Sequence, residues 1–545
     1  MFKLIKNIFS AAKEPVDTVP KASGPTAAEL QEKAGLLFSD GRILQAKDLY
    51  EQAVRLDPTL AKAHSMLGFL YLEEKNPLRA QHHIVKALEL DPSLANAHYL
   101  MGSILYDQGK IASSVASYQR AIELDNNQPF AYRDLGMAYI MLGQAQEANV
   151  IVDRGLELFP DFCDLHYYKG NLYSLALDYL SAEKSYSQAL FVDKKSLMLY
   201  TDLANAQAQQ NKVEDAIKTY QLALTEFPDA AEVKLSVGIS QLLLGDYLQG
   251  FKSYELRLKS FMLDFMSTLP KEARWTGQQD LSGKDILLIT EEGHGDTIQF
   301  IRFVKLLKSK KCKVIVVASP LLKRLLVTID GIDEVRDFGD EIAFDYYSPL
   351  MSLPLLLGTT VDTIPKNSSY ISSEPERVGV WRKKLRPKRN KPLVGIALTG
   401  NPEHKRNKSR SLDMKLAARL FSVDADFIIL QKDLSEYDRE ILRHYPHVRH
   451  YGPEMHDFSD TAALVDLVDL VISIDTSIAH LGGAMGKPTW VLIEYNPDWR
   501  WLLDRTDSPW YQSVRLFRQP KVRDWDSVAD DVKQALESFR QTLPA

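Results

Sequence analysis

The stretch with the clearest chemical potential is Thr290–Phe300, which reads TEEGHGDTIQF and follows an apolar run at 285–289. Its glycines bracket His294, and Asp296 stands where the next residues take on a helical pattern. An aspartate at a helix start can cap the helix. If one carboxylate oxygen stays free, the same residue can act as a general base toward a substrate hydroxyl. We therefore predict that Asp296 is catalytic, with His294 and Gly295 beside it in a cleft.

Two other classes of loop have a similar arrangement of glycines. A dinucleotide or methyl-donor loop needs an acidic residue at the end of the following strand, where it binds ribose hydroxyls. The following apolar run ends instead in Ala318, Ser319 and Pro320. The sequence thus counts against both a dinucleotide and a methyl-donor cofactor, and a SAM-dependent methyltransferase stays only as the alternative of a different class.

A second candidate loop follows the apolar run at 470–474. Asp475, Thr476 and Ser477 stand at the predicted start of a helix, where unpaired N–H groups and a partial positive charge favour a phosphate. His480 lies one turn further along the face of Thr476 and could add a donor. The alternative is purely structural, with Asp475 as an N-cap.

Basic and polar residues follow the predicted strands at 392–398 and 426–431. Lys405 and Arg410 come after the first of these strands, where fixed cations could offset the charge of a diphosphate. The other candidate binding residues of these two loops are Gly400, Asn401, Gln431 and Lys432.

These loops require a scaffold that brings strand ends together. Short β-rich runs occur in two clusters, at 285–375 and 390–515, and helical patterns separate most of them. Runs that are apolar throughout indicate parallel strands covered by helices on both faces. We predict two doubly wound halves that face a cleft, with ligands beyond the carboxyl ends of the strands.

Small residues recur every 34 residues through the preceding part of the chain. One such column consists of Ala34, Gly68, Gly102, Gly136, Gly170, Ala204 and Gly238. A second column, beginning at Ala53, breaks only at Arg257. Small residues at this period indicate helical hairpins that stack into a solenoid with a continuous core. We predict a groove that binds a protein partner; the alternative is a spacer or oligomerisation arm without a specific ligand.

The repeats resemble the tetratricopeptide repeat. With GDTIQFIRFVKLL, VGIALTGNPEHKRNKSRS and LVISIDTSIAHLGGAMGKPTWVLI, the chain looks like bacterial tetratricopeptide-repeat glycosyltransferases. Their catalytic part is similar to lipopolysaccharide heptosyltransferases and, more distantly, to O-GlcNAc transferase. The resemblance implies a GT-B-like pair of Rossmann-type half-domains, with the nucleotide-sugar held mainly by the C-terminal one. It also implies that Asp296 is catalytic and that the phosphate loop comprises Asp475, Thr476, Ser477 and His480.

Three features depart from the family pattern. Ser477 replaces the loop glycine, and Leu398 stands where an aromatic residue is common. The segment 285–380 is also short for a Rossmann half. Either the last repeat helices complete this half, or the solenoid builds part of the acceptor site. The departures also leave a competing hypothesis, a non-catalytic scaffold with a degenerate glycosyltransferase domain.

The predicted organisation combines an all-α tetratricopeptide solenoid with an α/β pair of half-domains. The predicted segments are a tail and linker at 1–26, seven repeats at 27–264, a linker at 265–284, an acceptor-side half at 285–380 and a nucleotide-sugar-binding half at 381–545. The predicted activity is the inverting transfer of a sugar from a nucleotide-sugar to a protein or glycan acceptor, without a metal or other cofactor.

Two short motifs allow two interpretations each. The sequence DAD at 424–426 fits the acidic motif of metal-dependent glycosyltransferases, but it precedes its strand, which favours a turn. Trp499 and Arg500 could touch a ligand near the cleft, or equally form core where the chain crosses back.

Composition limits the partners and the location. The 545-residue chain carries a net charge of −6, which gives no drive toward nucleic acid. Cys163 and Cys312 form no metal-type spacing and suit a reducing cytoplasm. No apolar run is long enough to span a membrane. A basic amphipathic pattern at residues 2–13 permits weak contact with the inner face of the membrane, and a frayed chain start is the alternative.

Overall fold

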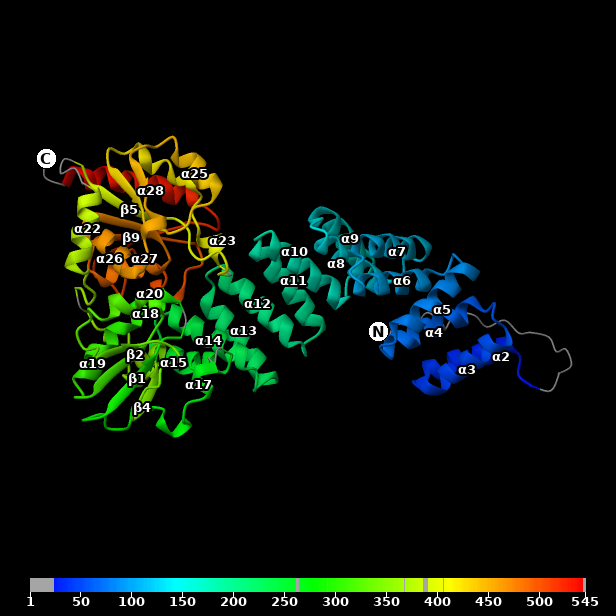
Figure 1. Ribbon diagram of the computed structural model, residues 1–545. Coiled ribbons are helices and arrows are strands. Elements are labelled where there is room, and N and C mark those ends of the chain that lie inside the picture. The colour runs from blue at the N-terminus through cyan, green and yellow to red at the C-terminus, as the bar shows by residue number, and fades with distance from the viewer. Residues whose placement is uncertain are drawn as a thin grey trace. The chain divides into compact units, whose positions relative to one another are not determined.

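The computed structural model describes residues 24–260, 264–291, 293–366, 368–385, 391–404 and 406–542. The chain divides into two compact units, residues 1–206 and 207–545 (Figure 1). Residues 2–13, for which we predict contact with a membrane surface, lie outside the described part. Within that part, no helix is both long and apolar enough to cross a bilayer.

Helix pairs follow one another from Ala27 to Tyr254, which confirms the predicted helical solenoid. The first five pairs are α2 (Ala27–Ser39) and α3 (Ile43–Leu56), α4 (Ala61–Glu73) and α5 (Pro77–Leu90), α6 (Ala95–Asp107) and α7 (Ile111–Leu124), α8 (Pro129–Met141) and α9 (Ala145–Leu158), and α10 (Cys163–Leu175) and α11 (Tyr179–Val192). The last two are α12 (Leu197–Gln209) and α13 (Val213–Glu226), and α14 (Ala231–Leu243) and α15 (Tyr247–Tyr254). The boundary between the two compact units falls inside α12.

The recurring small residues are explained by the packing within each pair. A Cβ added to Gly102 would lie 2.6 Å from the ring of Tyr118, and one added to Gly170 would lie 2.5 Å from the ring of Tyr186. Both tyrosines come from the second helix of the same pair, at the same offset. A larger side chain in this column would therefore push the two helices of a pair apart.

A histidine pair, with His64 buried and His83 half-buried, gives the first unit a predicted pH dependence. His64 of α4 and His83 of α5 place their Nδ1 atoms 2.9 Å apart, and Nε2 of His64 donates to the carbonyl of Pro58 at 3.1 Å. Neutral His64 therefore accepts at Nδ1 from the Nδ1–H of His83. Burial, and then the neighbouring His64 and His82, lower the pKa of His83 to about 4, and burial lowers the pKa of His64.

We expect acidification to loosen α4 and α5. Since the unfolded chain binds protons at a higher pH than folded His83, this stability is present above about pH 6.5 and is lost as the pH falls toward 4, by roughly 2 kcal/mol at pH 5. Hydrogen exchange of peptides from α4 and α5, compared at pH 7.5 and 5 after correction for intrinsic rates, measures the loss. His83→Asn should remove most of the difference, whereas His98→Asn, at an exposed ring bonded to Pro92, should leave it unchanged. Equal pH dependence in the His83 variant would contradict this account.

The second unit contains two sheets in which each paired strand runs parallel to its neighbours, as predicted (Figure 1). The first has the order β3-β2-β1-β4, from β1 (Asp285–Ile289), β2 (Lys313–Val317), β3 (Glu334–Arg336) and β4 (Tyr346–Pro349). The second has the order β10-β9-β8-β5-β6-β7, from β5 (Leu393–Ala397), β6 (Asp426–Ile429), β7 (Val448–His450), β8 (Leu470–Ile474), β9 (Thr489–Ile493) and β10 (Val514–Arg518).

The last repeat helices complete the half that contains the four-stranded sheet. Tyr247 and Phe251 of α15 join the same buried cluster as Ile286 and Leu288 of β1. Helices α18 (His294–Phe300), α19 (Val304–Lys308) and α20 (Pro320–Leu326) contribute to that cluster too. Met266 of α17 (Asp264–Ser267) packs with residues of the opposite face. The shortness of residues 285–380 is thus made up by the preceding repeat.

The six-stranded sheet is also covered on both faces. On one side, Val471 packs with α26 (Phe458–Leu467) and α27 (Ser477–Ala484). On the other, Ile472 packs with α24 (Met414–Ala417) and the terminal helix α28 (Trp525–Thr542). Val471 and Ile472 are consecutive residues of β8, and they pack on different sides because successive side chains of a strand point to opposite faces of the sheet.

Two predicted boundaries fall within packed structure. The predicted break after residue 380 lies inside α22 (Pro375–Leu385), where the indole N–H of Trp381 donates to Asp460 of α26 at 3.0 Å. The predicted linker at 265–284 contains Trp275, which is 1% exposed and donates its backbone N–H to the carbonyl of Tyr347 at 2.8 Å. Helix α22 therefore packs on the C-terminal half, and the linker is part of the core.

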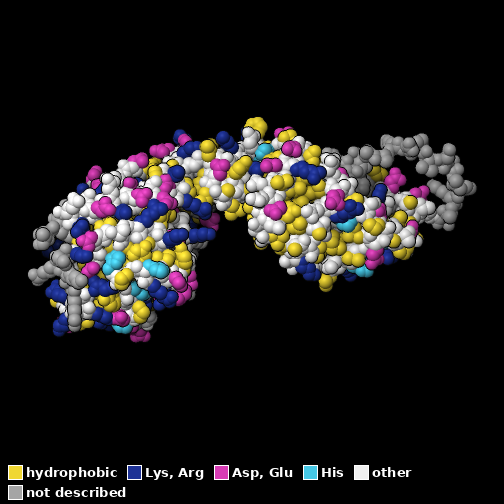
Figure 2. All heavy atoms as spheres, turned by 90° about the horizontal axis from the view of Figure 1, so that it is seen from above, with side chains coloured by type: hydrophobic (Ala, Val, Ile, Leu, Met, Phe, Trp, Pro, Cys, Tyr) yellow, Lys and Arg dark blue, Asp and Glu magenta, His cyan; other side chains and the backbone are white. Residues whose placement is uncertain are grey.

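The first compact unit, which contains most of the repeats, exposes many large apolar side chains. Leu44, Leu78, Leu175 and Phe191 are each more than half exposed. Figure 2 shows hydrophobic side chains gathered on the visible face of this unit. Exposed apolar groups in such number are typical of surfaces that bind proteins, and a solenoid of this kind suits a protein partner.

Candidate functional site

The central strands of the six-stranded sheet bring several loops to one edge. Because β9, β8, β5 and β6 lie side by side and run parallel, the segments after their carboxyl ends meet there. Gln431, after β6, accepts hydrogen bonds through Oε1 from the N–H groups of Leu398 at 2.8 Å and Thr399 at 3.2 Å. Gln431 therefore fixes the loop after β5, and its amide oxygen is used within the protein.

Arg410, in α23 (Asn407–Arg410), lies where two of these loops meet. Its Nη1 donates to the carbonyl of Asp475 at 2.8 Å. A Cβ added to Gly400 would lie 2.7 Å from Nη2 of Arg410, so the glycine leaves room for the guanidinium. The Nε of Arg410 is buried and has no hydrogen-bond partner among the described residues. Arg406, by contrast, is paired with Glu494 at 2.6 Å.

The start of α27 stands beside Arg410. Thr476 is the N-cap, and its side chain makes no cap hydrogen bond; its Oγ1 lies 3.1 Å from Oγ of Ser473. The N–H groups of Ser477 and Ile478 donate to no acceptor in the described part of the chain. Unpaired N–H groups at a helix start carry partial positive charge. With Arg410 they form an electropositive corner that can hold an anion.

His480 does not face this corner, which corrects the expectation that it donates to a phosphate. The residue is 5% exposed, its Nδ1 lies 2.9 Å from the hydroxyl of Tyr511, and its ring stacks on Trp501 with 5.4 Å between centroids. Burial, aided by the nearby Arg500, lowers the pKa of His480 to about 3. The ring is therefore neutral near pH 7 and part of the packing under α27.

Asp475 contributes its backbone rather than its side chain. Its carbonyl holds Arg410, and its Oδ1 lies 3.9 Å from Nε2 of His480. Burial and the charge of Asp498 raise the pKa of Asp475 to about 6. A carboxylate that faced a phosphate would repel it. Among the predicted residues, the ones placed to contact an anion are therefore Thr476, Ser477 and Arg410.

Helix α18 presents Asp296 from the other half. Its Oδ2 accepts from the N–H of Gly293 at 3.1 Å, and its Oδ1 accepts from Nη2 of Arg500 at 2.5 Å. Neither oxygen is free, contrary to the requirement that we set for a general base. Each carboxylate oxygen nevertheless has two lone-pair sites, and the side chain of Asp296 is 19% exposed. A substrate hydroxyl could therefore still donate to it.

Arg500 is a buried bridge rather than an exposed cleft residue. It is 7% exposed, pairs with Asp498 at 2.9 Å and donates from Nε to Gln299 at 2.7 Å, in addition to its contact with Asp296. Burial opposes the ionisation of Asp498, but Arg500 and Arg406 more than offset it, so the pKa of Asp498 lies below its usual value. The arginine therefore neutralises carboxylates from both halves.

The remaining predicted cleft residues are held by packing. Trp499 is 3% exposed and lies against Tyr247 and Phe251, with ring centroids 6.0 and 5.6 Å away, which supports the core interpretation. His294 is half-buried, its Nε2 lies 3.3 Å from Oγ of Ser319, and burial lowers its pKa.

Gly295 marks a close approach of the two halves. A Cβ added there would lie 2.9 Å from Cδ2 of His480 and 3.4 Å from Cα of Ser477. The first turn of α18 thus rests on the first turn of α27. Asp296 and the electropositive corner therefore lie at the starts of two neighbouring helices. One helix follows a strand of the four-stranded sheet, and the other follows a strand of the six-stranded sheet.

A buried ion pair that sequence reasoning missed fixes the loop before Asp296. Glu291 accepts from Nη2 of Arg257 at 2.8 Å and from the N–H of Met351 at 2.9 Å. Arg257 is 2% exposed. The sequence did contain a signal for this ion pair, because Arg257 is the residue that breaks the column of small residues beginning at Ala53. The last repeat thus anchors the loop that leads to the candidate base.

Two of the predicted binding residues have no structural role in the site. Asn401 and Lys432 are exposed, and the Oδ1 of Asn401 accepts from the N–H of Glu403 at 3.0 Å. Lys405 lies outside the described residues. In the described segments, no group of three or more His, Cys, Asp or Glu residues could hold a metal ion. Asp424 of the DAD motif pairs with Arg540 at 2.6 Å, ahead of β6.

Comparison with known proteins supports the repeats directly. Residues 102–143 match the family described as TPR repeat, and residues 169–231 match the family described as Tetratricopeptide repeat. The chain thus contains tetratricopeptide repeats in its helical N-terminal part, which is followed by a region with parallel sheets.

Two known proteins and one solved structure are similar to this chain over different lengths. The protein FlbA of Caulobacter vibrioides is 25% identical over 445 residues, covering 75% of this chain and 67% of FlbA. The type IV pilus assembly protein PilF of Pseudomonas aeruginosa is 24% identical over 156 residues, covering 27% of this chain and 61% of PilF. The crystal structure of PilW, a type IV pilus biogenesis factor, has a TM-score of 0.35 at 18% identity, covering 38% of this chain and 96% of PilW.

Proposed function

We propose that this protein is a nucleotide-sugar-dependent glycosyltransferase of the GT-B type, inverting and metal-independent, whose repeats present a protein or glycan acceptor. The observation that carries the proposal is the close approach of α18 to α27. It sets the carboxylate of Asp296 next to an electropositive corner with unpaired donors. The resemblance of several motifs to tetratricopeptide-repeat glycosyltransferases, taken in their order along the chain, supports the same reaction.

The proposed reaction needs two opposed groups. As the acceptor hydroxyl attacks the anomeric carbon, Asp296 takes its proton, and the bond to the nucleoside diphosphate breaks with its electron pair on the leaving oxygen. The N–H groups of Ser477 and Ile478, together with Arg410, stabilise the charge on the diphosphate. The two helix starts adjoin. A nucleotide-sugar therefore fits only if α18 and α27 separate slightly, or if its sugar lies along the open side of the two helices.

Binding of a nucleoside diphosphate tests the proposal without knowledge of the sugar. Calorimetry of the full chain with UDP, ADP and GDP should give micromolar binding for at least one of them. Arg410→Ala should weaken that binding roughly 10- to 100-fold, because a charge-assisted contact to the diphosphate is lost.

Lys408→Ala is the matched control, since Lys408 lies on the same short helix but is exposed. Its affinity should stay within a factor of about 2 of the unmodified protein at moderate salt. Absence of micromolar binding by all three nucleotides would contradict the proposal. Unchanged affinity of Arg410→Ala would remove that residue from the site.

A second candidate function is a non-catalytic scaffold. Both oxygens of Asp296 are already bonded, to Gly293 and Arg500, which favours a structural role. The type IV pilus assembly protein PilF resembles part of this chain, and a scaffold would assist assembly in a similar way. Such a scaffold would bind none of the three nucleotides.

A further inference from the structure

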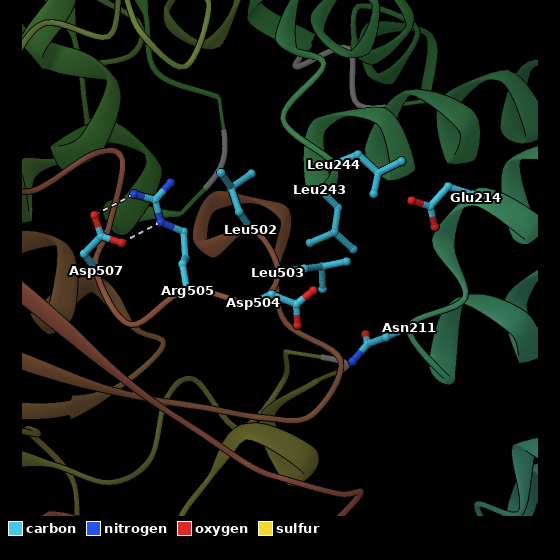
Figure 3. Close-up of a pocket in the computed structure, with 9 residues that line it drawn as sticks. All are labelled: Asn211, Glu214, Leu243, Leu244, Leu502, Leu503, Asp504, Arg505 and Asp507. Carbon is cyan, nitrogen blue, oxygen red and sulfur yellow. Dashed lines mark hydrogen bonds and ion pairs between the residues drawn. The ribbon is translucent and has the colours of Figure 1, made fainter.

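A second concave site lies in the 207–545 unit, and its lining contains none of the predicted site residues. It is a cavity of about 400 Å³ between the last repeats and the loop that precedes β10 (Figure 3). Its lining consists of Asn211, Glu214, Leu243, Leu244, Leu502, Leu503, Asp504, Arg505 and Asp507. Four leucines thus form an apolar floor under three carboxylates and one arginine.

The charge of the lining is unbalanced toward the negative. Arg505 is engaged by Asp507, with 2.6 Å between Nη2 and Oδ2. The side chains of Glu214 and Asp504 form no hydrogen bond or ion pair with any residue in the described part of the chain, and the charge of Asp504 interacts with that of nearby Arg518. Figure 3 shows them on opposite sides of the space that the leucines border, with Asn211 below. The Oδ1 of Asn211 is buried and has no described partner, while its Nδ2 donates to the carbonyl of Tyr495.

The loop is held in an unfavourable backbone conformation at this cavity. Leu502 has a φ of 52° and Asp504 a φ of 47°, in the left-handed region that a leucine rarely adopts. Arg518 fixes the segment by donating to the carbonyls of Trp501 at 2.6 Å and Arg505 at 2.7 Å. Backbone conformations of this kind persist only where the surroundings impose them, and they cluster at binding sites.

We propose that this cavity binds a lysine or arginine side chain of a protein partner. The aliphatic stem of such a side chain would lie on Leu243, Leu244 and Leu503, and its charged end between Glu214 and Asp504. Long basic side chains bury their stems on apolar surface in this manner while the charge stays near polar groups. The excess of carboxylates would repel an anionic ligand such as a nucleotide.

The cavity adjoins the candidate catalytic site through one short segment. Arg500, which holds Asp296, and Trp501, which stacks on His480, directly precede the lining residues Leu502 and Leu503. A partner seated in the cavity would thus rest on the chain segment that orders the candidate base. The inference concerns partner binding, so it stands whether or not the proposed transferase activity is correct.

Fluorescence anisotropy of the full chain with labelled model peptides tests the proposal. The probes are Gly-Leu-X-Leu-Gly peptides with capped ends, in which X is lysine, norleucine or glutamate. We expect the lysine peptide to bind tightest at about 50 mM NaCl and to weaken at about 500 mM. The double variant Glu214→Gln/Asp504→Asn should weaken the lysine peptide about 10-fold and lose most of the salt dependence.

Two controls separate binding from folding. Asp215→Asn removes an acid of α13 that pairs with Lys218 outside the cavity and should leave peptide affinity unchanged. Asp504→Gly should weaken the peptide while the thermal unfolding midpoint stays equal or rises, because glycine tolerates the left-handed backbone. Equal binding of the lysine and norleucine peptides, unchanged affinity of the double variant, or no binding to the unmodified protein at millimolar peptide would each overturn the proposal. The nucleotide affinities that test the transferase should not respond to these variants.

Discussion

Asp296→Asn is expected to slow sugar transfer 100- to 10,000-fold, because an amide cannot take the proton of the acceptor hydroxyl. The substitution keeps the shape of the side chain, and its amide oxygen can still accept from Arg500. Its NH2 group cannot accept from the N–H of Gly293 as Oδ2 does, so one hydrogen bond at the start of α18 is lost while the packing of α18 on α27 should persist. The measurement is the rate of nucleoside diphosphate release from a panel of nucleotide-sugars, followed with each donor that binds in calorimetry.

The control for this variant is Asp330→Asn, an exposed carboxylate in the same half of the protein. It should retain full rate. Nucleotide affinity of Asp296→Asn should lie close to that of the unmodified chain, which separates loss of the base from loss of the donor site. A rate near that of the unmodified protein would show that Asp296 is not the base, and would favour the bridge between Asp296 and Arg500 as a purely structural element.

Arg500→Met should lower the free energy of unfolding of the sheet-containing unit by about 3–5 kcal/mol. The arginine is buried between Asp296 and Asp498, and its removal leaves two carboxylates in a poorly hydrated site without a counter-charge. The loss can be measured by urea unfolding followed by tryptophan fluorescence, since all seven tryptophans lie beyond residue 206.

Neutralising one of the two unpaired carboxylates should recover part of the lost free energy of unfolding. Arg500→Met combined with Asp498→Asn is expected to be more stable than Arg500→Met alone, because one buried carboxylate no longer needs a partner. Arg443→Met is the matched surface control, since Arg443 and its partner Glu436 are both more than half exposed, and it should change stability by less than about 1 kcal/mol. A loss below 1 kcal/mol for Arg500→Met would mean that water reaches the two carboxylates.

The strands that the sequence predicted and those that it missed differ in position. Six β-rich runs in the sequence became strands that lie inside their sheets: 285–290 became β1, 312–318 β2, 392–398 β5, 426–431 β6, 470–475 β8 and 488–494 β9. The four missed strands, β3, β4, β7 and β10, are the edge strands of the two sheets. Edge strands are covered less completely and tolerate charges, as in Glu334–Arg336 and Val448–His450, so they lack a continuous apolar run.

The candidate site was predictable where it depends on loops that follow strands. Local order along the chain placed Asp296, Ser477 and Arg410 at the carboxyl ends of parallel strands. The pairing of Asp296 with Arg500 joins residues 204 positions apart, and no local pattern announces such a contact. The inward orientation of His480 likewise depends on Tyr511, which a later segment supplies.

The shared core of the last repeat and the first sheet restricts how the chain can be cut. A fragment that begins at residue 285 would open the surface that Tyr247 and Phe251 cover and would leave Glu291 without Arg257. Whole 34-residue modules could be trimmed from the distal end of the array without touching that surface. The final module is not interchangeable with the others, so length variation in such an array is confined to the side remote from the sheets.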